Sequence, residues 1–302
     1  MEVIRESNRS RSLPPWLKRK IPNLSECSRI EGVIKRRGLH TICREGLCPN
    51  RAECYARDKV TFMILGSVCT RDCAFCSVRS GHPGPPDRGE PEKIAEAVSE
   101  LGLDHVVVTS VTRDDLEDGG SGIFAEVVRR LRDMAEPPAV EVLVPDFRGS
   151  RGAIKRVIDS GPDIFSHNIE VVRTLYGKVR KGADYERSLN VLSIAREEGG
   201  ERLITKSAMM LGLGESEGEI FSTMEDLRQT GCDFLAIGQY LRPGLKQIPV
   251  SQYITPETFE SYASKGYQLG FRGVTAGPLV RSSYQEIDVD LFRDRYPSEP
   301  GS

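Results

Sequence analysis

The stretch "VTFMILGSVCTRDCAFC", residues 60–76, joins an apolar run directly to three closely spaced cysteines. The run at 60–66 is continuous rather than alternating, which is typical of a strand buried on both faces. Cys69, Cys73 and Cys76, here named the loop triplet, are therefore predicted on the loop at the carboxyl end of that strand. In parallel α/β folds, polar functional groups collect at this edge.

Further apolar runs repeat the pattern, and amphipathic segments separate them. Strands are also predicted at 104–110, 139–145, 163–170, 202–210 and 233–240. Helices are predicted at 92–102, 123–131, 151–159, 185–198, 217–230 and 256–268. Strand–helix repeats in one order predict a parallel sheet with right-handed crossovers. These repeats are too few for a complete barrel, so we expect an α/β fold with a partial (βα)6 TIM-type barrel; a doubly wound sheet is the alternative.

Two segments without this pattern flank the barrel, which is predicted to span residues 58–276. Residues 1–57 form an N-terminal extension with three more cysteines, Cys43, Cys48 and Cys54, here named the N-terminal triplet. Residues 277–302 form a C-terminal segment that holds "RSSY" and ends in a tail predicted to be loose.

The composition limits the classes of partner. The 302 residues carry a formal net charge of −2, so neither nucleic acid nor an anionic membrane surface is an expected partner. Apolar runs all stay well short of the roughly 20 residues that a membrane span requires. The N-terminus lacks the apolar core of a secretory signal, so we expect a cytoplasmic protein.

The cysteine pattern indicates metal binding. Six of the eight cysteines lie between residues 43 and 76, and in a reducing compartment such clustering favours metal ligation over disulfides. Three thiolates can each bind one iron of a cubic cluster, which leaves the fourth iron for a ligand that is not protein. The alternative for the loop triplet is a structural zinc site completed by His82, but such sites usually use paired ligands.

The N-terminal triplet likewise lacks a fourth ligand, and its alternative is a disulfide plus a spare thiol, which a reducing compartment disfavours. Cys232 is interpreted as a small buried apolar residue, and nothing local supports Cys27 as a ligand.

The loop triplet, with Phe75 beside its last cysteine, resembles the cluster loop of radical S-adenosylmethionine enzymes. The two triplets together with "RSSY" resemble the lipoyl synthase family. The similarity covers roughly residues 14–284 and includes "PPWLKRKIP", "CPNRAECY", "CAFCSV", "VTRDDLEDGG", "EVLVPDFRG", "PDIFSHNIE", "KVRKGADYERSL", "LGLGE" and "GQYLRP".

This resemblance implies that the loop triplet holds a 4Fe–4S cluster whose fourth iron binds S-adenosylmethionine and whose electron generates a 5′-deoxyadenosyl radical. It implies that the N-terminal triplet holds an auxiliary 4Fe–4S cluster with a serine of "RSSY" as fourth ligand. We choose Ser283 over Ser282. Without the resemblance, "RSSY" is better interpreted as a C-terminal cap, with Arg281 in a salt bridge and Tyr284 packed.

The resemblance also implies the reaction. Radicals on carbons 6 and 8 of an octanoyl chain attack the sulfides of the auxiliary cluster, and two S-adenosylmethionine molecules are used. The octanoyl chain is bound to a lysine of a carrier, such as the E2 subunit of a 2-oxoacid dehydrogenase or the glycine cleavage H protein. Electrons come from a reduced donor such as ferredoxin or flavodoxin.

Polar residues inside the predicted strands are candidate contacts of the cosubstrate, because a buried polar group needs a partner. Asn168 and Glu170 lie two apart and so share a face, Arg180 follows that strand, and Lys206 lies within the next one. With Phe75, these residues are predicted to contact S-adenosylmethionine through its ribose hydroxyls and carboxylate. The alternative is a structural Glu–Lys pair inside the barrel.

Three other functions fit parts of the pattern. They are a radical S-adenosylmethionine sulfurtransferase acting on a free small molecule, a zinc-stabilised binding module and an iron–sulfur electron carrier.

Overall fold

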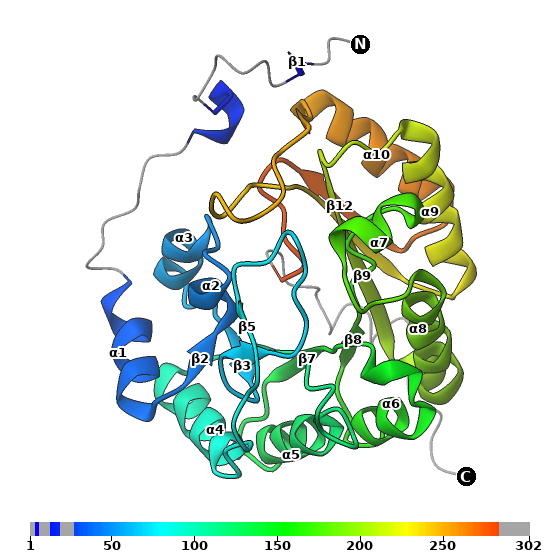
Figure 1. The fold of residues 1–302 in the computed structure, drawn as a ribbon. Coiled ribbons are helices and arrows are strands. Elements are labelled where there is room, and N and C mark those ends of the chain that lie inside the picture. Colours follow the sequence, from blue (N-terminus) through cyan, green and yellow to red (C-terminus); the bar gives the residue numbers. More distant parts are fainter. Residues whose placement is uncertain (1–3, 6–12, 19–26, 284–302) are drawn as a thin grey trace.

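The computed structural model describes residues 4–5, 13–18 and 27–283. The fold is built on an eight-stranded sheet with the strand order β12-β10-β9-β8-β7-β6-β3-β2 (Figure 1). The parallel strands are β3 (Thr61–Ile64), β6 (His105–Ser110), β7 (Ala139–Leu143), β8 (Ile164–Ser166), β9 (Ile204–Leu211), β10 (Phe234–Gln239) and β12 (Gly273–Gly277). The short β2 (His40–Thr41) pairs antiparallel with β3 at one end of the sheet. Since β2 and β12 end the order without pairing to each other, the barrel is open.

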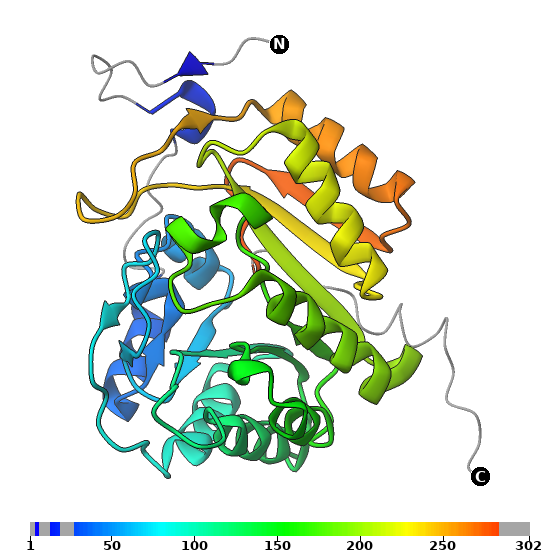
Figure 2. The same cartoon turned by 45° about the vertical axis from the view of Figure 1, so that its right-hand side comes forward.

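Helices cover the outside of this curved sheet (Figure 1). The crossover helices are α4 (Glu90–Leu101), α5 (Ser121–Arg132), α6 (Arg151–Ile158), α8 (Tyr185–Gly199), α9 (Glu217–Gln229) and α10 (Pro256–Gln268). Figure 2 shows the last three side by side along the long strands β9 and β10. The smaller elements are α1 (Ser28–Arg37), α2 (Ile42–Glu45), α3 (Arg51–Ala56), α7 (Tyr176–Val179), β1 (Ile4–Arg5), β4 (Val68–Cys69), β5 (Arg79–Ser80) and β11 (Gln252–Tyr253).

Burial explains the apolar runs. Val106 and Val108 of β6 are fully buried in one core cluster with Phe124 and Val128 of α5. Their neighbours Val107 and Thr109 face the barrel interior and are nearly as buried, so both faces of the strand are covered. No helix within the described ranges is both long and apolar enough to cross a membrane.

The structure confirms the predicted partial barrel. All predicted strands and crossover helices are present, and the parallel strands follow one another in chain order. A doubly wound sheet would reverse that order at a switch point, so this alternative is excluded.

The six predicted units are, however, one strand short. The chain continues from α10 into β12, a seventh parallel strand with the sequence "GVTAG". Its glycines and its small alanine carry no strand signal, and pairing with β10 provides the ladder instead. Tyr284 and the predicted loose tail lie outside the described residues.

Candidate active site

The loop triplet lies at the carboxyl end of β3, as predicted. Leu65 and Gly66 turn the chain with φ angles of 68° and 87°, and the Leu65 amide donates to Glu90 Oε2 at 2.7 Å. The loop then begins and ends in the short pair β4–β5, where the Gly81 amide donates to the Cys69 carbonyl at 2.9 Å. The three cysteines therefore lie on a closed loop at the functional edge of the barrel.

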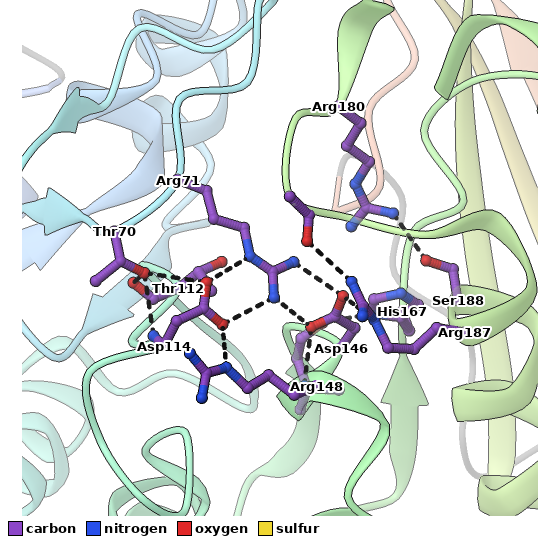
Figure 3. Close-up of polar contacts among 12 residues, drawn as sticks. Thr70, Arg71, Thr112, Asp114, Asp146, Arg148, His167, Arg180, Arg187 and Ser188 are labelled. Carbon is purple, nitrogen blue, oxygen red and sulfur yellow. Dashed lines mark hydrogen bonds and ion pairs between the residues drawn. The ribbon is translucent and has the colours of Figure 1, made fainter. Parts of the chain in front are cut away.

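Arg71, inside this loop, joins it to two neighbouring strands (Figure 3). Its guanidinium donates to Asp114, after β6, at 2.7 and 2.8 Å, and to Asp146, after β7, at 2.8 and 2.9 Å. Arg187 of α8 also donates to Asp146, at 2.8 Å. Burial pushes the pKa of Asp146 upward, but the hydrogen bonds and charge of Arg71 outweigh it and hold that pKa well below its ordinary value. We name Arg71, Asp114, Asp146 and Arg187 the clamp.

The other half of the loop is held by backbone contacts. The Ala74 amide donates to the Val179 carbonyl and the Ala74 carbonyl accepts from the Ile248 amide, both at 2.8 Å. Gln247 Nε2 donates to the Cys76 carbonyl at 3.0 Å. Phe75 packs against an apolar cluster that includes Val179, Met209 and Tyr240. The loop is thus fixed on both sides before any cofactor is considered.

The thiols of the loop triplet lie close enough to influence one another. Burial raises the pKa of Cys73 to about 12 and that of Cys76 to about 11, and the neighbouring sulfurs and Glu170 add to the rise. Among the described residues, no three or more His, Cys, Asp or Glu side chains converge tightly enough to hold a single metal ion. Buried soft donors of this kind become thiolates when a metal supplies positive charge, so the donor set fits an iron–sulfur cluster.

The N-terminal triplet lies on the short helices beside β2 and β3 (Figure 1). Cys43 is in α2, Cys54 in α3 and Cys48 in the turn between them. Burial raises the pKa of Cys43 to about 11 and that of Cys54 to about 12, and each of these rises is increased by the charge of other cysteines of the triplet. Two members of this second set of soft donors, Cys43 and Cys54, are therefore desolvated, and Cys48 lies near enough to influence both.

The two serines of "RSSY" lie in different environments. Thr61 Oγ1 of β3 donates to Ser283 Oγ at 2.9 Å, and Thr61 lies close enough to the Cys43 thiol to lower its pKa. Ser282 Oγ instead donates to Asn168 Oδ1 at 2.9 Å. Ser283 thus lies on the side of the N-terminal triplet, whereas Ser282 lies at the end of β8.

Three of the predicted cosubstrate contacts are brought together at that end of β8. Asn168 Nδ2 donates to Glu170 Oε1 at 3.1 Å, and Arg180 donates to the Asn168 carbonyl at 3.0 Å. Burial raises the pKa of Glu170, and Arg180 opposes the rise. Glu170 has a φ of 68°, a left-handed conformation that costs free energy in a residue other than glycine and that clusters at functional sites.

Lys206 lies in a different environment. Its ammonium donates to both carboxylate oxygens of Glu141 at 3.0 Å, and Ser166 donates to the same carboxylate at 2.8 Å. Lys206 is therefore in a buried ion pair inside the barrel, but its acid is Glu141 of β7 and not Glu170, the glutamate that the alternative interpretation concerned. A cosubstrate contact of Lys206 stays a prediction.

Sequence reasoning missed the clamp, Thr61 and Glu141. A charged residue inside the apolar run "AVEVL" was the available signal for Glu141, because an acid on a strand buried on both faces needs a partner. For Arg71, the signal was its position between two candidate ligands.

Comparisons with known proteins agree with this geometry. The family model described as the Radical SAM superfamily matches residues 63–227. The chain is 52% identical over 282 residues to the lipoyl synthase of Caldanaerobacter subterraneus subsp. tengcongensis, covering 93% of this chain and 98% of the relative. It is 48% identical over 271 residues to the lipoyl synthase of Caldicellulosiruptor saccharolyticus, covering 90% and 95% of the two chains.

A solved structure of methylornithine synthase superposes with a TM-score of 0.55 at 13% identity, covering 92% of this chain and 88% of that one, which supports the fold. The coverage and identity of the sequence matches establish the family as well as the fold. The chain therefore belongs to the lipoyl synthase family of the radical SAM superfamily, enzymes that insert sulfur using S-adenosylmethionine and 4Fe–4S clusters.

Proposed function

We propose that the two triplets divide the lipoyl synthase reaction between them on the partial barrel of residues 58–276, with residues 1–57 and 277–302 as flanking segments. In this proposal the loop triplet holds the cluster that binds S-adenosylmethionine. The N-terminal triplet and Ser283 hold the auxiliary cluster. When bound, the first group supplies a 5′-deoxyadenosyl radical that removes hydrogen from unactivated methylenes, and the second supplies the sulfur for C6 and C8 of the octanoyl chain.

The observation that carries the proposal is a chain of neighbouring residues that runs between the triplets. Glu170 lies near enough to Cys73 and Cys76 for its charge to raise the pKa of both thiols, and it accepts a hydrogen bond from Asn168. Asn168 accepts from Ser282, and the next residue, Ser283, accepts from Thr61, which lies beside Cys43. The two sets of thiols thus lie at the same mouth of the barrel and are connected by neighbouring residues. This arrangement is suited to a reaction in which a radical is generated at one set and sulfur is supplied at the other.

The chain's own residues have defined tasks here. Glu170 is suited to accept hydrogen bonds from ribose hydroxyls, and the guanidinium of Arg180 to meet the methionyl carboxylate. The clamp holds the cysteines still while the cosubstrate binds. A serine oxygen is a harder and weaker partner for iron than a thiolate, so Ser283 is suited to detach as sulfur leaves.

The division of labour is tested by Cys43→Ala and Cys73→Ala in anaerobically reconstituted protein. With an octanoyl-lysyl peptide, S-adenosylmethionine and reductant, Cys43→Ala should lose sulfur insertion yet still form 5′-deoxyadenosine, whereas Cys73→Ala should lose both. Iron should fall from about eight to about four per chain in each variant, as expected for loss of one cubic cluster. Equal loss of cosubstrate cleavage in Cys43→Ala would refute the assignment.

The relatives' identity gives a lipoyl carrier as the substrate. We propose the E2 subunit of a 2-oxoacid dehydrogenase or the glycine cleavage H protein as that carrier, and ferredoxin or flavodoxin as the electron donor. Turnover of an octanoylated carrier domain should exceed that of free octanoate, and preference for the free acid would count for the small-molecule alternative.

A further inference from the structure

The chain after β12 turns back into the mouth of the barrel (Figure 1). Val280 is buried there in an apolar cluster with Ala208 of β9 and Ala236 of β10. Asn50, which lies between Cys48 and Cys54, donates from its side-chain Nδ2 to the Leu279 carbonyl at 2.7 Å. Residues 278–283, here named the return segment, thus run across the sheet from its last strand to the N-terminal triplet.

A row of small residues makes room for the return segment. Ala236 and Gly238 are two apart on β10 and so share a face, and they pair with Ala208 and Met210 of β9. A Cβ atom at Gly238 would lie 2.1 Å from the Val280 oxygen and 3.0 Å from its carbonyl carbon. These are backbone atoms, so no side-chain rotation relieves the collision.

The requirement at Gly238 is for space alone. Its φ is not positive, so an alanine would fit the strand backbone without strain. Its neighbour across the ladder, Gly277, is less demanding, because a Cβ there would meet a methyl of Val280 at 3.3 Å. Close backbone approach of the return segment therefore depends on Gly238.

The position of Val280 sets the position of the serines that follow. Ser282 and Ser283 are two and three residues beyond it, and in the described part of the chain each side chain makes one hydrogen bond of 2.9 Å, to Asn168 and Thr61 respectively. Neutral hydrogen bonds contribute only about 1 kcal/mol each, so they cannot hold the segment once its backbone is pushed outward.

We propose that Gly238 is a positioning residue for sulfur insertion: the space left by its missing side chain seats Val280 and thereby holds Ser283 beside the N-terminal triplet. The inference rests on the proposed role of Ser283 and extends it to a residue that touches neither triplet. Gly238 acts through the return segment.

The test compares Gly238→Ala with Gly218→Ala in the full chain. Gly218, in α9, has open space where a Cβ would be added, so it is the matched control. In cluster-free protein, Gly238→Ala should raise hydrogen exchange of the 278–283 peptide, while Gly218→Ala leaves it unchanged. Unchanged exchange in a folded Gly238→Ala protein would refute the claim that Gly238 holds Val280 in place.

The reconstituted protein tests the consequence. Gly238→Ala should shift the auxiliary-cluster Mössbauer signal toward that of Ser283→Ala and lower sulfur insertion by about 100-fold, the cost of an ångström-scale misplacement. Formation of 5′-deoxyadenosine should stay within about twofold of the parent. Raised exchange with an unchanged signal and full insertion would overturn the positioning role.

Val280→Ala supports the test if Gly238→Ala does not fold. It keeps the backbone and removes part of the contact with Ala208 and Ala236, so it should raise exchange of the same peptide and shift the same signal to a smaller extent. If hydrogen exchange of the 278–283 peptide and the Mössbauer signal were both unchanged in Val280→Ala, the inference would be overturned. Loss of cosubstrate cleavage in Cys43→Ala would defeat the proposed function alone, because the exchange result stands without any cluster.

Discussion

The two triplets are held in opposite ways. The loop triplet is fixed by charged groups of adjacent barrel loops, with Arg71 between two carboxylates and its side chain only 7% exposed. The N-terminal triplet meets the return segment through neutral contacts, Asn50 to Leu279 and Thr61 to Ser283, that join residues 229 and 222 positions apart. Charge-assisted bidentate bonds are roughly twice as strong as neutral ones.

This difference matches the proposed division of labour. A site that binds cosubstrate in every turnover benefits from a rigid frame, and the clamp supplies it from within the barrel. A site that gives up sulfur benefits from one ligand that can leave, and within the described residues the Ser283 side chain makes one hydrogen bond, to the Thr61 hydroxyl. The structure thus combines a stiff site and a loosely tied one at the same barrel mouth.

The largest expected effect comes from breaking the clamp. Arg71→Ala leaves the buried Asp146 with Arg187 as its remaining cation, and removal of one partner of a buried ion pair costs about 3 kcal/mol. Urea unfolding of cluster-free protein measures the loss. The control is Arg148→Ala, whose side chain is 66% exposed and lies 3.4 Å from Asp114, and which should change stability by less than about 0.5 kcal/mol. Equal losses in the two variants would mean that the clamp is not a rigid frame.

The next effect distinguishes the two serines. Ser283→Ala should lower sulfur insertion by about 100-fold, because it removes the proposed fourth ligand of the auxiliary cluster. Ser282→Ala removes one neutral bond to Asn168 and should cost only about fivefold, the equivalent of about 1 kcal/mol. Mass spectrometry of the octanoyl-lysyl product measures both. A larger loss in Ser282→Ala would reverse our choice of ligand.

The smallest effect is a pH dependence that arises from the buried His167. His167 is fully buried, its Nδ1 donates to the Val144 carbonyl at 2.8 Å, and burial lowers its pKa to about 4. Because the unfolded state binds a proton near pH 6.5 and the folded state does not, this contribution to stability is complete above about pH 6.5 and is lost as the pH falls toward 4.

The contribution of His167 to the slope in this window, measured as the parent minus His167→Asn difference, should approach about 1.4 kcal/mol per pH unit, the value for one proton. The total slope is smaller, because burial raises the pKa of Glu90 to about 7 and its titration in the same window acts with the opposite sign. Urea unfolding of the cluster-free protein between pH 4 and 7 measures it. His167→Asn keeps an amide donor for Val144 and cannot titrate, so it should lower the slope by that contribution. An identical slope in the variant would show that other groups are responsible.

The sequence by itself determined the alternation of strands and helices, because continuous apolar runs and helical periodicity are local properties of the chain. It also put the loop triplet at the end of β3, since the cysteines directly follow an apolar run. It did not reveal β12, whose "GVTAG" has little strand preference and depends on the ladder of β10. The preference for Ser283 over Ser282 came from resemblance rather than from any local pattern.

Tertiary structure alone decided which groups meet. Lys206 pairs with Glu141, 65 residues away, Arg71 with Asp146, 75 residues away, and Ser283 with Thr61 on the first barrel strand. The need for glycine at position 238 likewise arises from a carbonyl more than forty residues later in the chain. Periodicity reports whether a side chain is buried, whereas its partner depends on how the barrel brings distant segments together.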